Sequence, residues 1–456
     1  MKVLILVESP AKAKKIKSFL NSNYIVKASF GHIRRLIKNI NAIDTESFKM
    51  VFESDKSKVI KEIKDIKKRV DEVILASDED REGEAIAWHL AVVLKLDIRS
   101  TKRIVFHEIT KKAILKSLEN PGVIRMNMVE SQLARQTLDH LVGFRWSPLL
   151  WKYINGPTGM SAGRVQSVIV KLIMELEEKI NNFEEETYYK IDGIFNKVIN
   201  SLIMKKFKKN DSIEILKKST ESNFTISDIN IKKSEYKPPP PYITSTMLQD
   251  ISRSTGMSSK TIMGIAQKLH ENGDITYHRS DSLNLSKEFL KEASVHIDSK
   301  YGDKYKKIRQ FKSSDGAQEA HEAIRPTNIK NENVKDPSYN KVYKYIYKRA
   351  LASQMSNKIV NKISLVIKSD NYRYEFISTI EETLFKGFKI LYKEEKDNVE
   401  LIKYYKSLKI GDILKYNKIK SNQSYTSTKD YFSEPTLIKK LDELGIGRPS
   451  TLSSLI

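Results

Sequence analysis

Residues 73–94 read VILASDEDREGEAIAWHLAVVL, and this stretch decides the fold of the N-terminal part of the chain. The apolar run Val73 to Ala76 predicts a strand buried on both faces, and residues 85–96 have the apolar spacing of a helix. Val3 to Val7 predicts a second buried strand, and we expect a third from Arg103 to Phe106. Strands that alternate with helices predict an α/β domain with a largely parallel sheet.

Three carboxylates, Asp78, Asp80 and Glu82, directly follow the buried strand at 73–76. Alternate residues of an extended strand end point to one side, so these side chains can meet at the carboxyl edge of the sheet. Glu8 ends the first strand and is expected at the same edge. Mg²⁺ prefers such oxygen ligands together with phosphate oxygens, so the pattern predicts a magnesium site. A solvated acidic loop with Glu82 at a helix N-terminus is the alternative.

A second constellation, GDITYHRSDS, occupies residues 273–282. Tyr277 and Arg279 are two residues apart, so they are expected to share one face of a short strand at 275–277. A guanidinium beside the phenol favours the phenolate and can also bind a phosphodiester. Tyr277 is therefore a candidate nucleophile. Because the chain has 21 tyrosines, an ordinary core or surface tyrosine is the alternative.

Both stretches resemble type IA DNA topoisomerases. The motif VESPAKAKKI, which holds Glu8 and Lys12, followed by ASDEDREGEAIAWHL, is similar to the family's Toprim domain and closest to that of bacterial topoisomerase I. The resemblance implies that Asp78 and Asp80, assisted by Glu82, hold Mg²⁺. It also implies that Lys12 or Glu8 handles the proton of a 3′ hydroxyl leaving group.

The motif ITYHRSDS resembles the active-site motif of the same family, with Tyr277 at the position of the nucleophile and Arg279 beside the phosphate. His278 and Ser280 stand where the bacterial group more usually has Met and Thr. The later motif AHEAIRPT implies that His321 lies near the scissile phosphate. Further motifs imply a single-strand-binding groove, with Gln136 where some members have a second Arg, and with these contacts: Arg135, Asp139, Arg164, Gln166, Arg325, Arg448 and Thr451.

The predicted fold class is multidomain, α/β and α+β, with a toroidal type IA topoisomerase architecture. Four prolines at 238–241 predict a stiff connector at one boundary. The expected parts are a Toprim domain (1–120), a helical groove domain (121–186 and 431–456), a strand-rich arch (187–241 and 358–430) and a helical domain that carries the tyrosine (242–357). Because the chain stops just after GRPST, we expect an incomplete groove domain and weak or no strand passage by this chain alone.

The composition limits the partners of the chain. Its 80 Lys+Arg and 57 Asp+Glu give a net charge of +23, which favours a polyanionic partner. The absence of cysteine excludes disulfides, thiolate zinc sites and a cysteine nucleophile in this chain. No apolar run approaches the length of a membrane span, and no P-loop motif indicates a nucleotide.

The resemblance implies relaxation of negatively supercoiled DNA through Mg²⁺-dependent, ATP-independent single-strand cleavage, a 5′-phosphotyrosyl intermediate, strand passage and religation. It further implies a monomer that acts on single-stranded and negatively supercoiled DNA, in the cytoplasm at the nucleoid if the source is bacterial; a viral source leaves the location open. A topoisomerase III-like decatenase is the alternative within the enzyme class, although its N-terminal motif usually resembles AEKPS. A non-catalytic basic DNA-binding protein is the alternative from another class, and it accounts for the charge but not for the acidic and tyrosine motifs.

Overall fold

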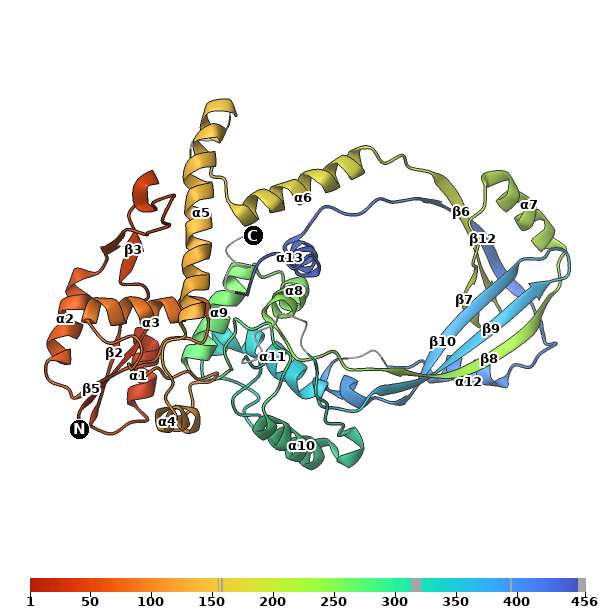
Figure 1. Cartoon of the computed structure of the whole chain (residues 1–456). Coiled ribbons are helices and arrows are strands. Elements are labelled where there is room, and N and C mark those ends of the chain that lie inside the picture. The colour runs from red at the N-terminus through yellow and green to blue at the C-terminus, as the bar shows by residue number, and fades with distance from the viewer. Residues whose placement is uncertain (155, 157–158, 313–320, 394–395, 450–456) are drawn as a thin grey trace.

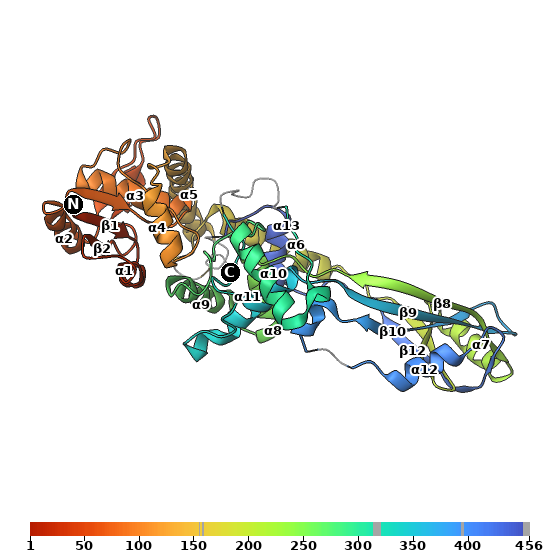
Figure 2. The ribbon, with the colours of Figure 1, turned by 90° about the horizontal axis from the view of Figure 1, so that it is seen from below.

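The computed structural model describes residues 1–154, 156, 159–312, 321–393 and 396–449. The chain forms a ring, with an α/β domain and a helical domain on one side and a long sheet on the other (Figure 1). Seen from below, the N-terminal domain and the sheet lie at opposite ends of an elongated molecule (Figure 2). In the described part of the chain, no helix has the length and apolar character needed to cross a membrane.

The N-terminal domain is built on three parallel strands in the order β2 (Tyr24–Ala28), β1 (Val3–Val7) and β5 (Glu72–Leu75). Four helices belong to this part of the chain: α1 (Pro10–Lys17), α2 (Ser57–Lys67), α3 (Arg81–Leu94) and α4 (Lys111–Glu119). A small hairpin of β3 (Arg34–Leu36) and β4 (Phe52–Ser54) extends from it. Every residue of β1 is buried, which explains its continuous apolar run.

The predicted strand at 103–106 is wrong. Only Arg103 pairs with the sheet, through a single parallel bridge to Leu75. The reason is that β5 ends at Leu75, and the chain beyond it turns away toward α3. The sheet's third strand is instead β2, whose residues are only partly buried and whose apolar run is broken by Lys27.

Two long helices lead from this domain to the far side of the ring, α5 (Met126–Tyr153) and α6 (Arg164–Asn181). The far side is a seven-stranded sheet in the order β11-β8-β9-β10-β7-β6-β12. Its strands come from two separate stretches of the chain: β6 (Thr187–Phe195), β7 (Val198–Ile203), β8 (Phe224–Tyr236), β9 (Lys358–Ser369), β10 (Glu375–Phe385), β11 (Ile413–Leu414) and β12 (Tyr416–Tyr425). The helices α7 (Lys209–Thr220) and α12 (Val399–Ser407) contribute to its apolar core.

In the sequence, the helical domain lies between the two stretches that build this sheet. Its core is formed by α8 (Thr244–Thr255), α9 (Ser259–Glu271), α10 (Lys287–Tyr301) and α11 (Asn340–Ser353), against which α13 (Glu434–Glu443) packs. Short 3₁₀ turns occur at Ile40–Ala42, Asp303–Tyr305, Pro337–Tyr339 and Gly387–Leu391. The predicted strand at 275–277 is only one bridge, between Ile275 and Pro326. Tyr277 therefore lies in a loop that is held by tertiary contacts and not by a sheet.

Candidate active site

The loop between β5 and α3 places the first two predicted metal ligands. Asp80 caps α3, because its Oδ1 accepts a hydrogen bond from the Gly83 amide at 2.7 Å. A Cβ at Gly83 would lie 2.2 Å from the Asp78 carbonyl oxygen, so the loop can close only around glycine. The Arg103 guanidinium also donates a hydrogen bond to the Asp78 carbonyl oxygen, at 2.8 Å. Backbone contacts thus hold Asp78 and Asp80 at the carboxyl edge of the sheet.

Glu8, Lys12 and Asp78 form a buried charge cluster. The Lys12 side chain is fully buried, and its ammonium pairs with the carboxylates of both Glu8 and Asp78. Burial and the charge of Asp78 raise the pKa of Glu8 to about 8, although Lys12 opposes this shift. Burial is the largest influence on Asp78 and disfavours its ionisation, but the Lys12 charge and the hydrogen bonds with Glu8 and Lys12 together hold the pKa of Asp78 below its usual range. Glu8 therefore keeps its proton to a higher pH than Asp78 does.

Tyr277 comes from the helical domain and meets the N-terminal domain at this cluster. Its hydroxyl donates a hydrogen bond to Asp80 Oδ2 at 2.6 Å, and its backbone N–H donates to the His107 carbonyl at 2.8 Å. The side chain is only 6% exposed. Asp80 and Tyr277 are 197 residues apart in the sequence, so only the fold brings them together.

Arg279 favours the phenolate of Tyr277, as expected, but other influences on the Tyr277 pKa are larger. Burial and the charges of Asp78 and Asp80 raise the pKa of Tyr277 well above its usual value, and the opposing effect of Arg279 is smaller. Burial also raises the pKa of Asp80. The guanidinium of Arg279 is directed instead to Glu82, with Nη1 3.3 Å from Oε2. Tyr277 is therefore a neutral phenol that donates its proton toward a carboxylate.

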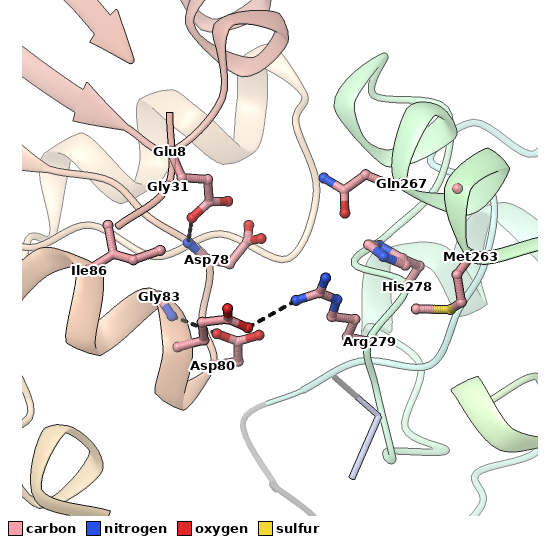
Figure 3. A pocket seen from close by; sticks show the side chains of 12 residues that line it. Glu8, Gly31, Asp78, Asp80, Gly83, Ile86, Met263, Gln267, His278 and Arg279 are labelled. Carbon is pink, nitrogen blue, oxygen red and sulfur yellow. Dashed lines mark hydrogen bonds and ion pairs between the residues drawn. The ribbon is translucent and has the colours of Figure 1, made fainter. Parts of the chain in front are cut away.

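The carboxylates of this site and Arg279 border one cavity of about 380 Å³, whereas Tyr277 and Lys12 are not among its lining residues. Figure 3 shows Glu8, Asp78 and Asp80 on one side and Gln267, His278 and Arg279 facing them from the helical domain. Glu82 also borders the cavity. Carboxylates thus lie along one wall and hydrogen-bond donors along the other. The donor wall can bind a phosphodiester directly, whereas the carboxylate wall would need a cation between itself and the phosphate.

The donor set fits a hard cation such as Mg²⁺. Within the described ranges, no three His, Asp or Glu side chains are gathered closely enough to enclose a metal ion. Mg²⁺ is, however, commonly held by one or two carboxylates together with water and phosphate oxygens. The raised pKa of Glu8 also indicates more negative charge than the cluster can ionise, which a cation would relieve.

Comparisons with known proteins agree with this geometry. Residues 3–109 match the family model described as Toprim domain, and residues 123–456 match the one described as DNA topoisomerase. The chain belongs to the type IA DNA topoisomerase family. The resemblance noted in the sequence and the predicted fold class are thereby confirmed.

Several relatives in this family are similar over the whole chain. DNA topoisomerase 1 of Rickettsia felis is 41% identical over 99% of this chain and 63% of its own length. DNA topoisomerase 1 of Campylobacter jejuni is 41% identical over the full chain and 68% of its own length. The solved structure of full-length topoisomerase I from Thermotoga maritima has a TM-score of 0.88 at 34% identity, covering 99% of this chain and 77% of that one. This chain thus spans about 63% of the Rickettsia felis relative.

Among the histidines near this site, His321 lies between Tyr277 and the Toprim domain. Its Nε2 contacts the Glu79 carbonyl of the Toprim domain, and its ring centroid is 6.3 Å from that of Tyr277. His270 was missed by the sequence analysis, although its ring is 5.3 Å from Tyr277 and its Nε2 is 3.9 Å from Asp78 Oδ1. Burial lowers the pKa of His270 to about 4, so it is neutral here. Its position near the end of α9 gave no signal in the sequence that His270 would lie beside Tyr277 and Asp78.

Of the predicted groove contacts, three meet on α5 and α6. Arg164 Nε is 2.8 Å from Asp139 Oδ1, and Arg135 Nε is 3.6 Å from Asp139 Oδ2. Gln166 contacts Ser161, where its amide donates to the carbonyl at 2.6 Å. These side chains are at least partly exposed, as a DNA contact requires.

The remaining predicted contacts lie elsewhere. Arg448 Nη1 is 4.0 Å from Asp281 Oδ2, and Thr451 lies outside the described residues. Arg325 is only 5% exposed, and its guanidinium pairs with Glu322 and Glu108. In this arrangement Arg325 is engaged by protein carboxylates and is not presented to the groove of α5 and α6.

Proposed function

We propose that this chain acts on single-stranded and negatively supercoiled DNA and relaxes it by ATP-independent, Mg²⁺-dependent cleavage, strand passage and religation. The observation that carries the proposal is the hydrogen bond from the Tyr277 hydroxyl to Asp80, which joins a candidate nucleophile to the Toprim carboxylates across a domain interface. A basic DNA-binding protein without catalysis has no need of this buried pair. The similarity to proteins named DNA topoisomerase 1 favours relaxation over decatenation.

In the proposed cleavage step, Tyr277 Oη attacks the phosphorus and the bond from phosphorus to the 3′ oxygen breaks. The tyrosine proton passes to Asp80, which already accepts it in a hydrogen bond of 2.6 Å. Glu8 is protonated near neutral pH and donates its proton to the leaving 3′ oxygen. Arg279 stabilises the charge that develops on the phosphate. The product is a 5′-phosphotyrosyl bond and a free 3′ hydroxyl, so the phosphodiester energy is retained and no ATP is needed.

In religation the same steps run in reverse, with Glu8 and Asp80 exchanging their roles. Asp78 and Asp80, assisted by Glu82, are the residues that would hold Mg²⁺. When bound by these residues, Mg²⁺ would supply positive charge that stabilises the negative charge of the reacting phosphate. Lys12 keeps Asp78 ionised and therefore available as a ligand. A monomer is sufficient for this chemistry, because one chain contributes both walls of the cavity.

The first test is covalent trapping on single-stranded DNA. We expect wild-type protein to form a denaturant-resistant adduct with a 5′-phosphate-linked fragment and Tyr277→Phe to form none, since the phenyl ring keeps the packing but lacks the nucleophile. Tyr431→Phe is the matched control, because Tyr431 is 61% exposed. An adduct that persists in Tyr277→Phe would remove this residue from its proposed role.

A further inference from the structure

The ion pair of Arg325 and Glu108 crosses the interface between the helical domain and the Toprim domain. Arg325 Nη1 is 3.0 Å from Glu108 Oε2, and only 6% and 21% of the two side chains are exposed. We propose that this pair is a latch that holds the Tyr277 segment against the Toprim domain. Arg325 is thus a positioning residue and not a DNA contact.

Both arms of the latch are oriented before they meet. On the helical side, Glu322 accepts two hydrogen bonds from the Arg325 guanidinium, at 2.7 Å and 2.9 Å, and the Phe289 ring lies 4.8 Å beneath it. On the Toprim side, Thr110 Oγ1 donates to Glu108 Oε1 at 2.9 Å. A fixed guanidinium loses little conformational entropy when it binds a second carboxylate.

The backbone around Arg325 supports the segment that carries the tyrosine. The Thr276 amide donates to the Arg325 carbonyl at 2.9 Å, and the Arg325 amide donates to Thr276 Oγ1 at 2.9 Å. The next residue, Tyr277, donates its N–H to the His107 carbonyl, beside Glu108. The latch therefore acts one residue away from the contact that seats Tyr277 on the Toprim domain.

The Arg325–Glu108 ion pair has little apolar packing on the side that faces a cavity between the two domains. At Gly273 the two domains touch closely, since a Cβ there would lie 2.5 Å from the Ile109 carbonyl oxygen. Beside the ion pair, however, the seam opens into a cavity of about 470 Å³ between α4 and α10. Loss of the ion pair is therefore not compensated by apolar packing at this point.

The purpose of the latch rests on the proposed function, because strand passage requires Tyr277 and the Toprim carboxylates to separate after cleavage. A polar latch can open and reform, since water and ions can bind both charged groups in the open state. The closed contact itself is a property of the protein without DNA or metal, and it can be tested in that state.

The test measures the distance between α4 and α10. The chain has no native cysteine, so Glu119→Cys and Lys291→Cys, both exposed, accept a donor and an acceptor dye at these two sites alone. Without DNA, we expect Glu108→Gln to raise the population with the larger distance about tenfold. Glu292→Gln, which removes an exposed carboxylate from the wall of the same cavity, should leave the distribution unchanged. An unchanged distribution in Glu108→Gln would overturn the proposal.

A second variant separates the latch from a DNA contact. Arg325→Lys keeps the charge but loses the double hydrogen bond to Glu322, and we expect it to widen the distance distribution while single-strand affinity stays within about twofold. In the Arg325→Lys background, Glu108→Gln should have a smaller effect than it has alone. A fall in single-strand affinity at an unchanged distance would show that Arg325 contacts DNA and would overturn the latch. Absence of the Tyr277 adduct in the unsubstituted protein would contradict the proposed function but leave the distance result intact.

Discussion

The Toprim–helical interface and the seven-stranded arch are held together by different forces. At the interface, the contacts that bring the domains together are largely polar: Tyr277 with Asp80, Arg279 with Glu82, and Arg325 with Glu108. The arch is held by strand ladders and by an apolar core. Polar contacts can be exchanged for contacts with water or DNA, whereas an apolar core cannot be opened without large cost. The difference indicates which of the two regions is easier to separate.

The largest effect is expected in the arch. Phe376 is fully buried, with ring centroids 4.9 Å from Phe195 and 6.1 Å from Phe224. Phe376→Ala removes this packing and leaves a cavity, so we expect a loss of about 3–5 kcal/mol in the free energy of unfolding. Hydrogen exchange of the β9 and β10 amides measures it locally. Tyr277→Phe is the comparison at the interface. If it lowers the local stability around Tyr277 by as much as Phe376→Ala lowers that of β9 and β10, the two regions do not differ as proposed.

The second effect concerns the carboxylates of the interface. Asp78→Asn together with Asp80→Asn removes two proposed Mg²⁺ ligands, and we expect Mg²⁺-dependent religation of a preformed adduct to slow about a hundredfold. Single-strand affinity should not fall, because the substitutions remove negative charge. Glu62→Gln, an exposed carboxylate of the same domain, is the control. Religation at the wild-type rate in the double variant would show that the metal assignment is wrong.

Much of the fold could be predicted because the segments that decide it have apolar patterns within their own sequence. The apolar runs at 3–7 and 73–76 are buried strands, as predicted. The half-buried strand at 24–28 has a shorter apolar run that is broken by Lys27, and Ile104 to Phe106 are apolar without forming a strand. A continuous apolar run indicates that a segment is buried, but it does not show whether the buried segment is a strand or a loop.

The site was less predictable wherever its chemistry depends on contacts distant in the sequence. The motifs pointed to Tyr277 and Arg279 as neighbours, but the pKa of the tyrosine is governed first by burial and by Asp78 and Asp80. Spacing along one segment cannot reveal those partners. Arg325 gives the same lesson, because the motif marked the residue but not Glu108, the carboxylate from the other domain that it binds.

The third effect is a pH dependence that only the interface should show. The pKa of Glu8 is raised to about 8 by burial and by Asp78, so Glu8 carries the proton needed by the 3′ oxygen below that pH and loses it above. At a fixed, limiting Mg²⁺ concentration, we expect the rate of adduct formation to fall about tenfold per pH unit above 8. In Glu8→Gln, the rate below pH 8 should be lower and this alkaline limb should vanish. An unaltered limb in Glu8→Gln would assign the titration to another group.

The smallest effect is expected for an ion pair on the arch, and it sharpens the comparison of the two regions. Lys362 and Glu381 are directly opposite each other on β9 and β10, with 3.4 Å between Nζ and Oε1, but about 40% of each side chain is exposed. Lys362→Met should therefore change the free energy of unfolding by less than about 1 kcal/mol, because an exposed pair gains little over hydration. Hydrogen exchange of the same β9 and β10 amides measures it.

The Arg325–Glu108 pair has similar chemistry but is mostly buried and lies beside a cavity. Removing it should therefore lower local stability by more than Lys362→Met does. Equal effects would mean that burial at the interface adds nothing to the strength of the latch.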